Sequence, residues 1–187
     1  HISGQNPRSL TLGGITISSA KTYGYYARVK VADGSVSYLK AMEASEHFLF
    51  YNLAVRSDGL HLIGSFRKSA TFQSTSYSHQ GSAIVIFRAA LTTGQLNQHR
   101  VISTNSSISH HVSTLNEDGD WYLIAKYIGS VQNMPFTTPE ASSFTTSYVI
   151  TKYSPATNTF GNWAVTFTDN SGSPSSTSIG NWNYFGN

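Results

Sequence analysis

The sequence predicts an all-β protein built from antiparallel, four-stranded repeats of about 60 residues. Three observations predict this fold class. Aromatic residues make up 13% of the chain and charged residues only 11%, and Ser, Thr, Asn and Gly dominate the polar remainder, a mixture typical of twisted sheets and turns. A pattern of strands and turns recurs along the chain, and no stretch has the apolar periodicity of a long helix.

The repeat is marked by a polar turn that leads into an apolar strand. Residues 57–65 (SDGLHLIGS) match residues 117–125 (EDGDWYLIA), and both place Asp-Gly before a run of apolar side chains. Residues 1–4 (HISG) match the end of the same strand, as though the first copy began inside a repeat. The copies are therefore offset by about 60 residues.

Two further strands, joined by a turn, complete each repeat. The first of the two carries a basic residue near its end, and the turns fall at Asp33-Gly34, Thr93-Gly94 and Thr157-Asn158. The strands expected before these turns are residues 25–31, 82–89 and 147–153, and those expected after them are residues 35–41, 95–103 and 160–168. The second repeat is the most complete, with strands expected at residues 50–56, 60–66, 82–89 and 95–103.

The matches divide residues 1–187 into a single repeat array. A partial repeat, two full repeats, and a tail or the start of a further strand are expected at residues 1–45, 46–105, 106–170 and 171–187, respectively. Within residues 38–53 the apolar spacing is mixed and Glu43 and Glu46 lie in the middle, so a helical turn is the less favoured alternative to strands there. Stacking is expected, because one small twisted sheet cannot bury both of its faces alone.

The order of these elements resembles the repeat of bacterial seven-bladed β-propellers, which occurs on secreted and cell-surface proteins. Residues 62–65 (LIGS), 84–88 (IVIFR) and 148–153 (YVITKY) carry the likeness. The third copy departs from the pattern, with Ala125-Lys126 in place of Gly-Ser and an insert that includes Met134 and Pro135. The resemblance implies β-propeller-like blades and an extracellular or cell-surface location.

About three repeats are fewer than a closed ring requires, because propellers typically contain four to eight blades. The chain is therefore expected to be part of a longer propeller, to complete a ring by assembly, or to form a sandwich or stacked array instead. Open faces and edges predict self-assembly or a protein partner.

Composition argues against several classes of site. The chain has no cysteine, which excludes disulfides and thiolate chemistry. No window approaches the roughly 18 apolar residues of a membrane-spanning helix, so no membrane span is expected. The net charge of +3 is scattered, and no basic stripe of the kind that binds nucleic acid is present in the sequence.

The candidate chemical motifs favour structural roles over catalysis. His99, His110 and His111 are the best metal candidates, but adjacent residues of a strand point to opposite faces, so no metal site is expected. Asp58 and Asp118 occupy equivalent positions and read as turn formers rather than as a glycosidase pair. Neither a nucleophile elbow nor a phosphate-binding loop occurs in the sequence. We therefore expect no enzyme activity and no cofactor.

Aromatic residues are the remaining signal for binding. Phe48 and Phe50 alternate as core residues do, whereas Tyr23, Tyr77 and Phe136, with His79, are expected in equivalent loops that emerge on one face. The function predicted is a non-catalytic, extracellular structural or adhesive module. A carbohydrate-binding module, with these four residues as its ligand-binding surface, is the alternative, and a fragment of a polysaccharide-active enzyme is less favoured.

One basic residue recurs at the end of each strand that precedes a turn: Lys30, Arg88 and Lys152. Recurrence in every repeat favours a packing role, because a binding site normally uses one or two specialised repeats. We expect each residue to cap its strand and to hold a carbonyl or a carboxylate. The alternative is a ring of positive charge for an acidic ligand.

Overall fold

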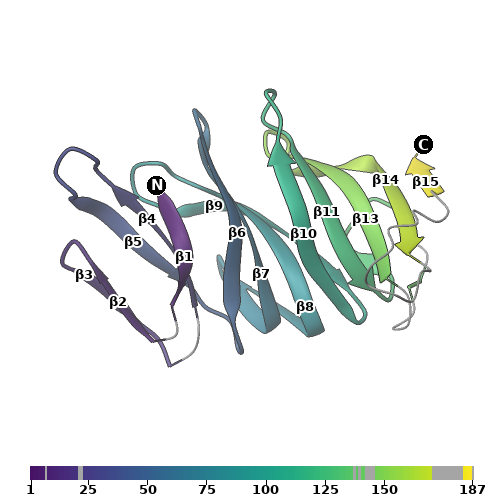
Figure 1. Ribbon diagram of the computed structural model, residues 1–187, viewed down its shortest axis with the longest axis horizontal. Coiled ribbons are helices and arrows are strands. Elements are labelled where there is room, and N and C mark those ends of the chain that lie inside the picture. The colour runs from purple at the N-terminus through teal and green to yellow at the C-terminus, as the bar shows by residue number, and fades with distance from the viewer. Residues whose placement is uncertain are drawn as a thin grey trace. The chain divides into compact units, whose positions relative to one another are not determined.

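The computed structural model describes residues 1–6, 8–20, 23–136, 138, 140–141, 146–169 and 183–186. Strands make up 72% of the described residues, the sheets are antiparallel, and these residues contain no helix. The predicted all-β, antiparallel class is therefore confirmed, and the sheets are open (Figure 1). Within the described ranges, no helix is long and apolar enough to cross a membrane.

The chain divides into two compact units. Unit 1 contains His1–Ser78 and Val85–Arg100, and unit 2 contains His79–Ile84 and Val101–Asn187.

The first repeat forms a three-stranded sheet and a separate hairpin. The sheet has the order β1-β4-β5, and the hairpin pairs β2 with β3. The bounds of these strands are β1 Ile2–Asn6, β2 Ser9–Leu12, β3 Ile15–Ser18, β4 Tyr23–Val29 and β5 Val36–Met42.

The second repeat forms most of a five-stranded sheet with the order β12-β9-β8-β7-β6. The two central strands are longer than expected: β7 runs continuously past residue 66, and β8 begins before residue 82. No helical turn occurs within residues 38–53, where β5 and β6 lie instead. The bounds are β6 Phe48–Arg56, β7 Gly59–Phe72, β8 Thr75–Ala89, β9 Leu96–Thr104 and β12 Val131–Gln132.

The third repeat lies in a five-stranded sheet with the order β10-β11-β13-β14-β15. Strand β15 falls within residues 171–187 and pairs with β14, while residues 171–182 and 187 of that expected tail lie outside the described residues. The bounds are β10 Ser107–Leu115, β11 Trp121–Ile128, β13 Thr146–Ser154, β14 Thr159–Asp169 and β15 Asn183–Gly186.

The turns and hairpin tips of the first two repeats have the same backbone geometry at an offset of 60 positions. In the turn at residues 30–35 the Lys30 amide donates to the Ser35 carbonyl over 2.8 Å, and in the turn at residues 90–95 the Ala90 amide donates to the Gln95 carbonyl over 2.8 Å. Hairpin tips are equivalent too, with positive φ at Gly13-Gly14 and at Gln73-Ser74. Shared backbone geometry supports the repeat more strongly than sequence likeness does.

The core of unit 1 is aromatic. Phe48, Phe66, Phe72 and Phe87 are 0–2% exposed, and the Phe72 ring lies 5.1 Å from the Phe87 ring in an edge-to-face arrangement. Phe48 and Phe50 alternate on β6 with ring centroids 5.0 Å apart, as the sequence predicts for core residues.

The core of unit 2 follows strict alternation along β11. Trp121, Leu123, Ala125 and Tyr127 are 0–2% exposed, while the residues between them are partly or fully exposed. This period of two is what a sheet with one buried face requires, and it explains why the strand can be read from the sequence.

Candidate functional site

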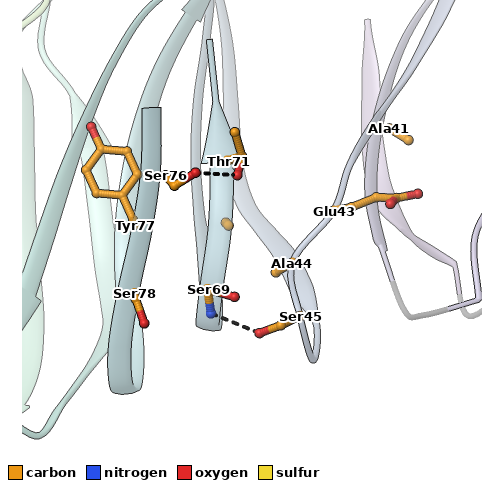
Figure 2. Close-up of a pocket in the computed structure, with 10 residues that line it drawn as sticks. Ala41, Glu43, Ala44, Ser45, Ser69, Thr71, Ser76, Tyr77 and Ser78 are labelled. Carbon is orange, nitrogen blue, oxygen red and sulfur yellow. Dashed lines mark hydrogen bonds between the residues drawn. The ribbon is translucent and has the colours of Figure 1, made fainter. Parts of the chain in front are cut away.

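An open groove of about 650 Å3 lies in unit 1. It runs between the segment after β5 and the hairpin of β7 and β8 (Figure 2). Its lining is rich in hydroxyl groups and small side chains and comprises Ala41, Glu43, Ala44, Ser45, Ser69, Ala70, Thr71, Ser76, Tyr77 and Ser78.

Two buried alanines and a backbone bridge hold one wall of the groove. Ala44 and Ala70 form an isolated antiparallel bridge and are 5% and 6% exposed. Beside them, the Ser45 hydroxyl accepts a hydrogen bond from the Ser69 amide over 2.9 Å and donates to the Arg67 carbonyl over 3.3 Å (Figure 2). This hydroxyl therefore fixes the wall and has little capacity left for a ligand.

The hairpin of β7 and β8 offers the groove polar groups that face solvent. The Thr71 and Ser76 hydroxyls lie 3.1 Å apart across the hairpin, and Ser78 is the next residue on the same face of β8 (Figure 2). All three residues are exposed. A ligand in the groove would meet these hydroxyls as both donors and acceptors of hydrogen bonds.

Glu43 provides the charge of the groove. It is the one ionisable carboxylate among the ten lining residues, it is exposed, and none of those ten residues is Lys, Arg or His. A carboxylate oxygen accepts hydrogen bonds strongly, so Glu43 suits a partner that offers hydroxyl donors. The arrangement can bind a neutral, hydroxyl-rich molecule and would repel an anion.

Tyr77 was predicted to be a loop residue, and that placement is wrong. It lies on β8, and its ring points away from Ser76 and the other labelled residues of the groove (Figure 2). The ring packs 5.9 Å from Phe72, and its hydroxyl lies 2.9 Å from His99 Nε2. Tyr77 therefore joins the aromatic core and gives the groove no stacking surface.

The hydrogen bonds around His99 determine which ring nitrogen carries the proton. Gln73 Nε2 donates to the Leu96 carbonyl over 2.7 Å, so Gln73 Oε1 faces His99 Nδ1 at 3.0 Å and accepts a hydrogen bond from the Nδ1–H group. His99 Nε2 is then the acceptor for the Tyr77 hydroxyl. Burial, with a smaller contribution from Arg100, lowers the pKa of His99, in keeping with a neutral ring that ties the hairpin tip to β9.

The other three predicted binding residues are scattered between the units. Tyr23 is the first residue of β4 and is 0% exposed, so its predicted loop position is also wrong. His79 lies on β8 rather than in a loop, and burial lowers its pKa. Phe136 lies in a bend after β12, half-buried. Tyr23 and Tyr77 belong to unit 1, and His79 and Phe136 to unit 2.

The histidine pair on β10 has separate partners. His110 Nε2 lies 3.0 Å from the Ser113 hydroxyl, whereas the His111 ring lies 5.4 Å from the Tyr148 ring. Among the described residues, no three His, Cys, Asp or Glu side chains are placed to hold a metal ion.

A second polar cluster surrounds Asp58 in the two-residue turn between β6 and β7. One carboxylate oxygen accepts from His61 Nε2 over 2.9 Å, and the other accepts from Arg88 Nη1 over 3.3 Å. Burial alone would raise the pKa of Asp58, but the hydrogen bond and charge of His61, then Arg88, outweigh it and lower that pKa. Both Asp58 oxygens already accept hydrogen bonds from the protein, so the cluster stabilises the turn between β6 and β7.

Sequence reasoning missed the residues that give the groove its polarity. Glu43 follows a closing strand, and Thr71, Ser76 and Ser78 alternate with buried or half-buried residues. The signal was the period of two in hydroxyl side chains, which marks the solvent face of a strand.

No protein-family model, curated protein or solved structure matches this chain.

Proposed function

We propose that this chain is a non-catalytic, extracellular repeat module that serves as a structural or adhesive scaffold. Its repeats are of the bacterial seven-bladed β-propeller type, as the order of strands and turns suggests. The low charge density and the abundance of hydroxyl and amide side chains favour a location outside the cell or on its surface. The partner is a protein or a further copy of the repeat.

One observation carries the proposal: the recurring basic residues form pairs with carboxylates of their own repeats. Arg88 pairs with Asp58 over 3.3 Å, and Lys152 pairs with Asp120 over 2.9 Å. Lys30 pairs with Asp33 over 3.1 Å in an exposed turn. The partly buried pairs of Arg88 and Lys152 stabilise strand ends, which is what a scaffold needs, and all three basic residues have a carboxylate partner within their own repeat.

We expect Arg88→Ala to lower the free energy of unfolding by about 1 kcal/mol, because it removes a partly buried ion pair and the aliphatic stem that lies against Gly59. Chemical denaturation followed by tyrosine and tryptophan fluorescence measures the change. Lys30→Ala is the matched control and should leave stability unchanged, because that pair is exposed. If Arg88→Ala kept its stability but lost the binding of an acidic ligand, Arg88 would have a binding role rather than a packing role.

Carbohydrate binding is the second candidate function, and the groove is the observation that favours it. A neutral sugar presents many hydroxyl groups, and exposed Thr71, Ser76, Ser78 and Glu43 match them with donors and acceptors. The absence of an aromatic platform among the side chains facing the groove favours weak, hydroxyl-directed binding.

If the groove binds glycans, a Ser76→Ala/Ser78→Ala double variant and Glu43→Gln should each weaken binding about tenfold, because each removes roughly one or two hydrogen bonds to the ligand. A glycan array followed by calorimetry with the best neutral oligosaccharide measures the loss. Phe136→Ala, in unit 2, is the control and should bind as the unchanged chain does. Binding lost only in Phe136→Ala would move the sugar site to unit 2.

A further inference from the structure

The contact between the first two repeats shows how one repeat covers the next. The buried Tyr26 hydroxyl of β4 donates to the Gly94 carbonyl over 2.7 Å, and Arg28 Nη1 donates to the Leu91 carbonyl over 3.4 Å. Both acceptors lie in the turn at residues 90–95 of the second repeat. Gly94 is buried as a result.

Tyr38 of β5 closes the same turn from the side. A Cβ atom at position 94 would lie 2.5 Å from a Tyr38 ring carbon. The fit therefore requires glycine at position 94, both for this close approach and for its φ of +64°.

The equivalent turn of the first repeat, at residues 30–35, is exposed to solvent at residues 31–35. Residues 30–35 have the same hydrogen bonds and the same positive φ at Gly34, +70°. A Cβ at Gly34 would meet no atom within 4 Å, and Val31, the counterpart of half-exposed Leu91, is 100% exposed. The exposed residues Val31 and Gly34 are the counterparts of Leu91 and Gly94, whose carbonyls accept hydrogen bonds from Arg28 and Tyr26.

Strand β1 gives a second, independent indication. It is the counterpart of residues 62–66 of β7, which pair with β6 on one side, Phe48 opposite Phe66 and Phe50 opposite Gly64. In the described sheet β1-β4-β5, strand β1 pairs with β4 alone. Among the described strands, none pairs with the other edge of β1, which corresponds to the edge of β7 that pairs with β6.

We infer that the turn at residues 30–35 and the free edge of β1 form a docking surface for one further repeat of this same type. The partner is a segment equivalent to residues 23–56, because in this chain that segment covers the matching surface of the second repeat. Its phenol donates to the Gly34 carbonyl, its aromatic side chain lies over Gly34, and its last strand pairs with β1. The inference rests on the proposed scaffold role, which it deepens by naming the partner.

The 60-residue offset between repeats allows a tandem chain to be designed that tests this docking surface. His1 is the counterpart of His61, so a tandem chain in which residues 1–60 precede the full sequence continues the repeat in register. Because the chain has no cysteine, Val31→Cys in the recipient copy is the sole thiol, and its labelling by a maleimide reports exposure.

In the tandem chain we expect labelling of Val31→Cys to slow at least tenfold, to the rate of Leu91→Cys in the original chain. We also expect Gly34→Ala in the recipient copy, harmless to packing in the original chain, to lower the melting temperature of the tandem chain as much as Gly94→Ala does in the original chain. Tyr26→Phe in the added copy should restore part of the labelling rate.

Fast labelling in a tandem chain whose circular dichroism shows the added strands folded would overturn the inference. Slow labelling of Val31→Cys in the original chain that becomes fast on dilution would also overturn the inference. A second copy of the chain would then be what covers the turn at residues 30–35. The Arg88→Ala experiment does not involve this surface, so failure of the scaffold proposal and failure of the docking inference are distinguishable.

Discussion

Gly94→Ala is expected to lower the free energy of unfolding of unit 1 by about 2–4 kcal/mol. Two costs add. An L-residue at a φ of +64° costs about 1 kcal/mol relative to glycine. The new methyl group would also lie 2.5 Å from the Tyr38 ring, and such overpacking typically costs about 1–3 kcal/mol because the ring and the Tyr26 hydrogen bond must shift.

Gly34→Ala separates these two costs. Gly34 has nearly the same φ, +70°, in the same turn, and nothing lies within 4 Å of the added methyl group. We therefore expect only the conformational cost, about 1 kcal/mol. Urea unfolding of the two variants side by side measures the difference, and equal losses would show that Tyr38 adapts without cost.

Much of the fold could be predicted because strand alternation is a local property. Trp121 to Tyr127 places every second side chain in the core, and the turns at Gly34 and Gly94 are marked by glycine at the position of positive φ. These signals lie within a few residues of the structure they specify. The succession of strands and turns along the chain and the 60-residue offset follow from these signals.

The lengths of β7 and β8 could not be predicted in the same way. Strand β7 continues through Lys68, whose φ of +62° interrupts regular strand geometry, and Glu46 from a distant segment pairs with Lys68 and Arg67 there. The hairpin tip at Gln73-Ser74 lacks the glycines of Gly13-Gly14, so a turn signal is missing although the conformation is the same. Tyr77 and His79 were therefore expected in a loop.

The candidate site was less predictable than the fold, because it depends on segments that are far apart in the sequence. Ser45 and Ser69 meet because Ala44 forms an antiparallel bridge with Ala70 of β7, and the Tyr77 hydroxyl is held by His99 of β9. The equivalence of Asp58 and Asp118 was likewise incomplete. Both lie in turns, but Arg88 pairs with Asp58 whereas Lys152 pairs with Asp120, because the turns at residues 57–58 and 116–120 differ in length.

Phe48→Ala is expected to have the largest effect in unit 1, a loss of about 3–5 kcal/mol in the free energy of unfolding. Phe48 is 0% exposed, and its ring lies 5.0–6.1 Å from the rings of Phe50, Phe72 and Phe87. Its removal breaks three aromatic contacts at once and leaves a cavity in the core.

The cavity would be hard to fill, and this raises the expected loss toward the upper end of that range. Gly24 and Gly64 lie against the Phe48 ring and have no side chain that could move into the space. Val55→Ala, on the same strand but 51% exposed, is the control and should cost less than about 1 kcal/mol. Urea unfolding measures both variants. Similar losses for the two would mean that β6 does not pack into the core of unit 1, and the contact between the first two repeats would then have to depend on the turn at residues 90–95 alone.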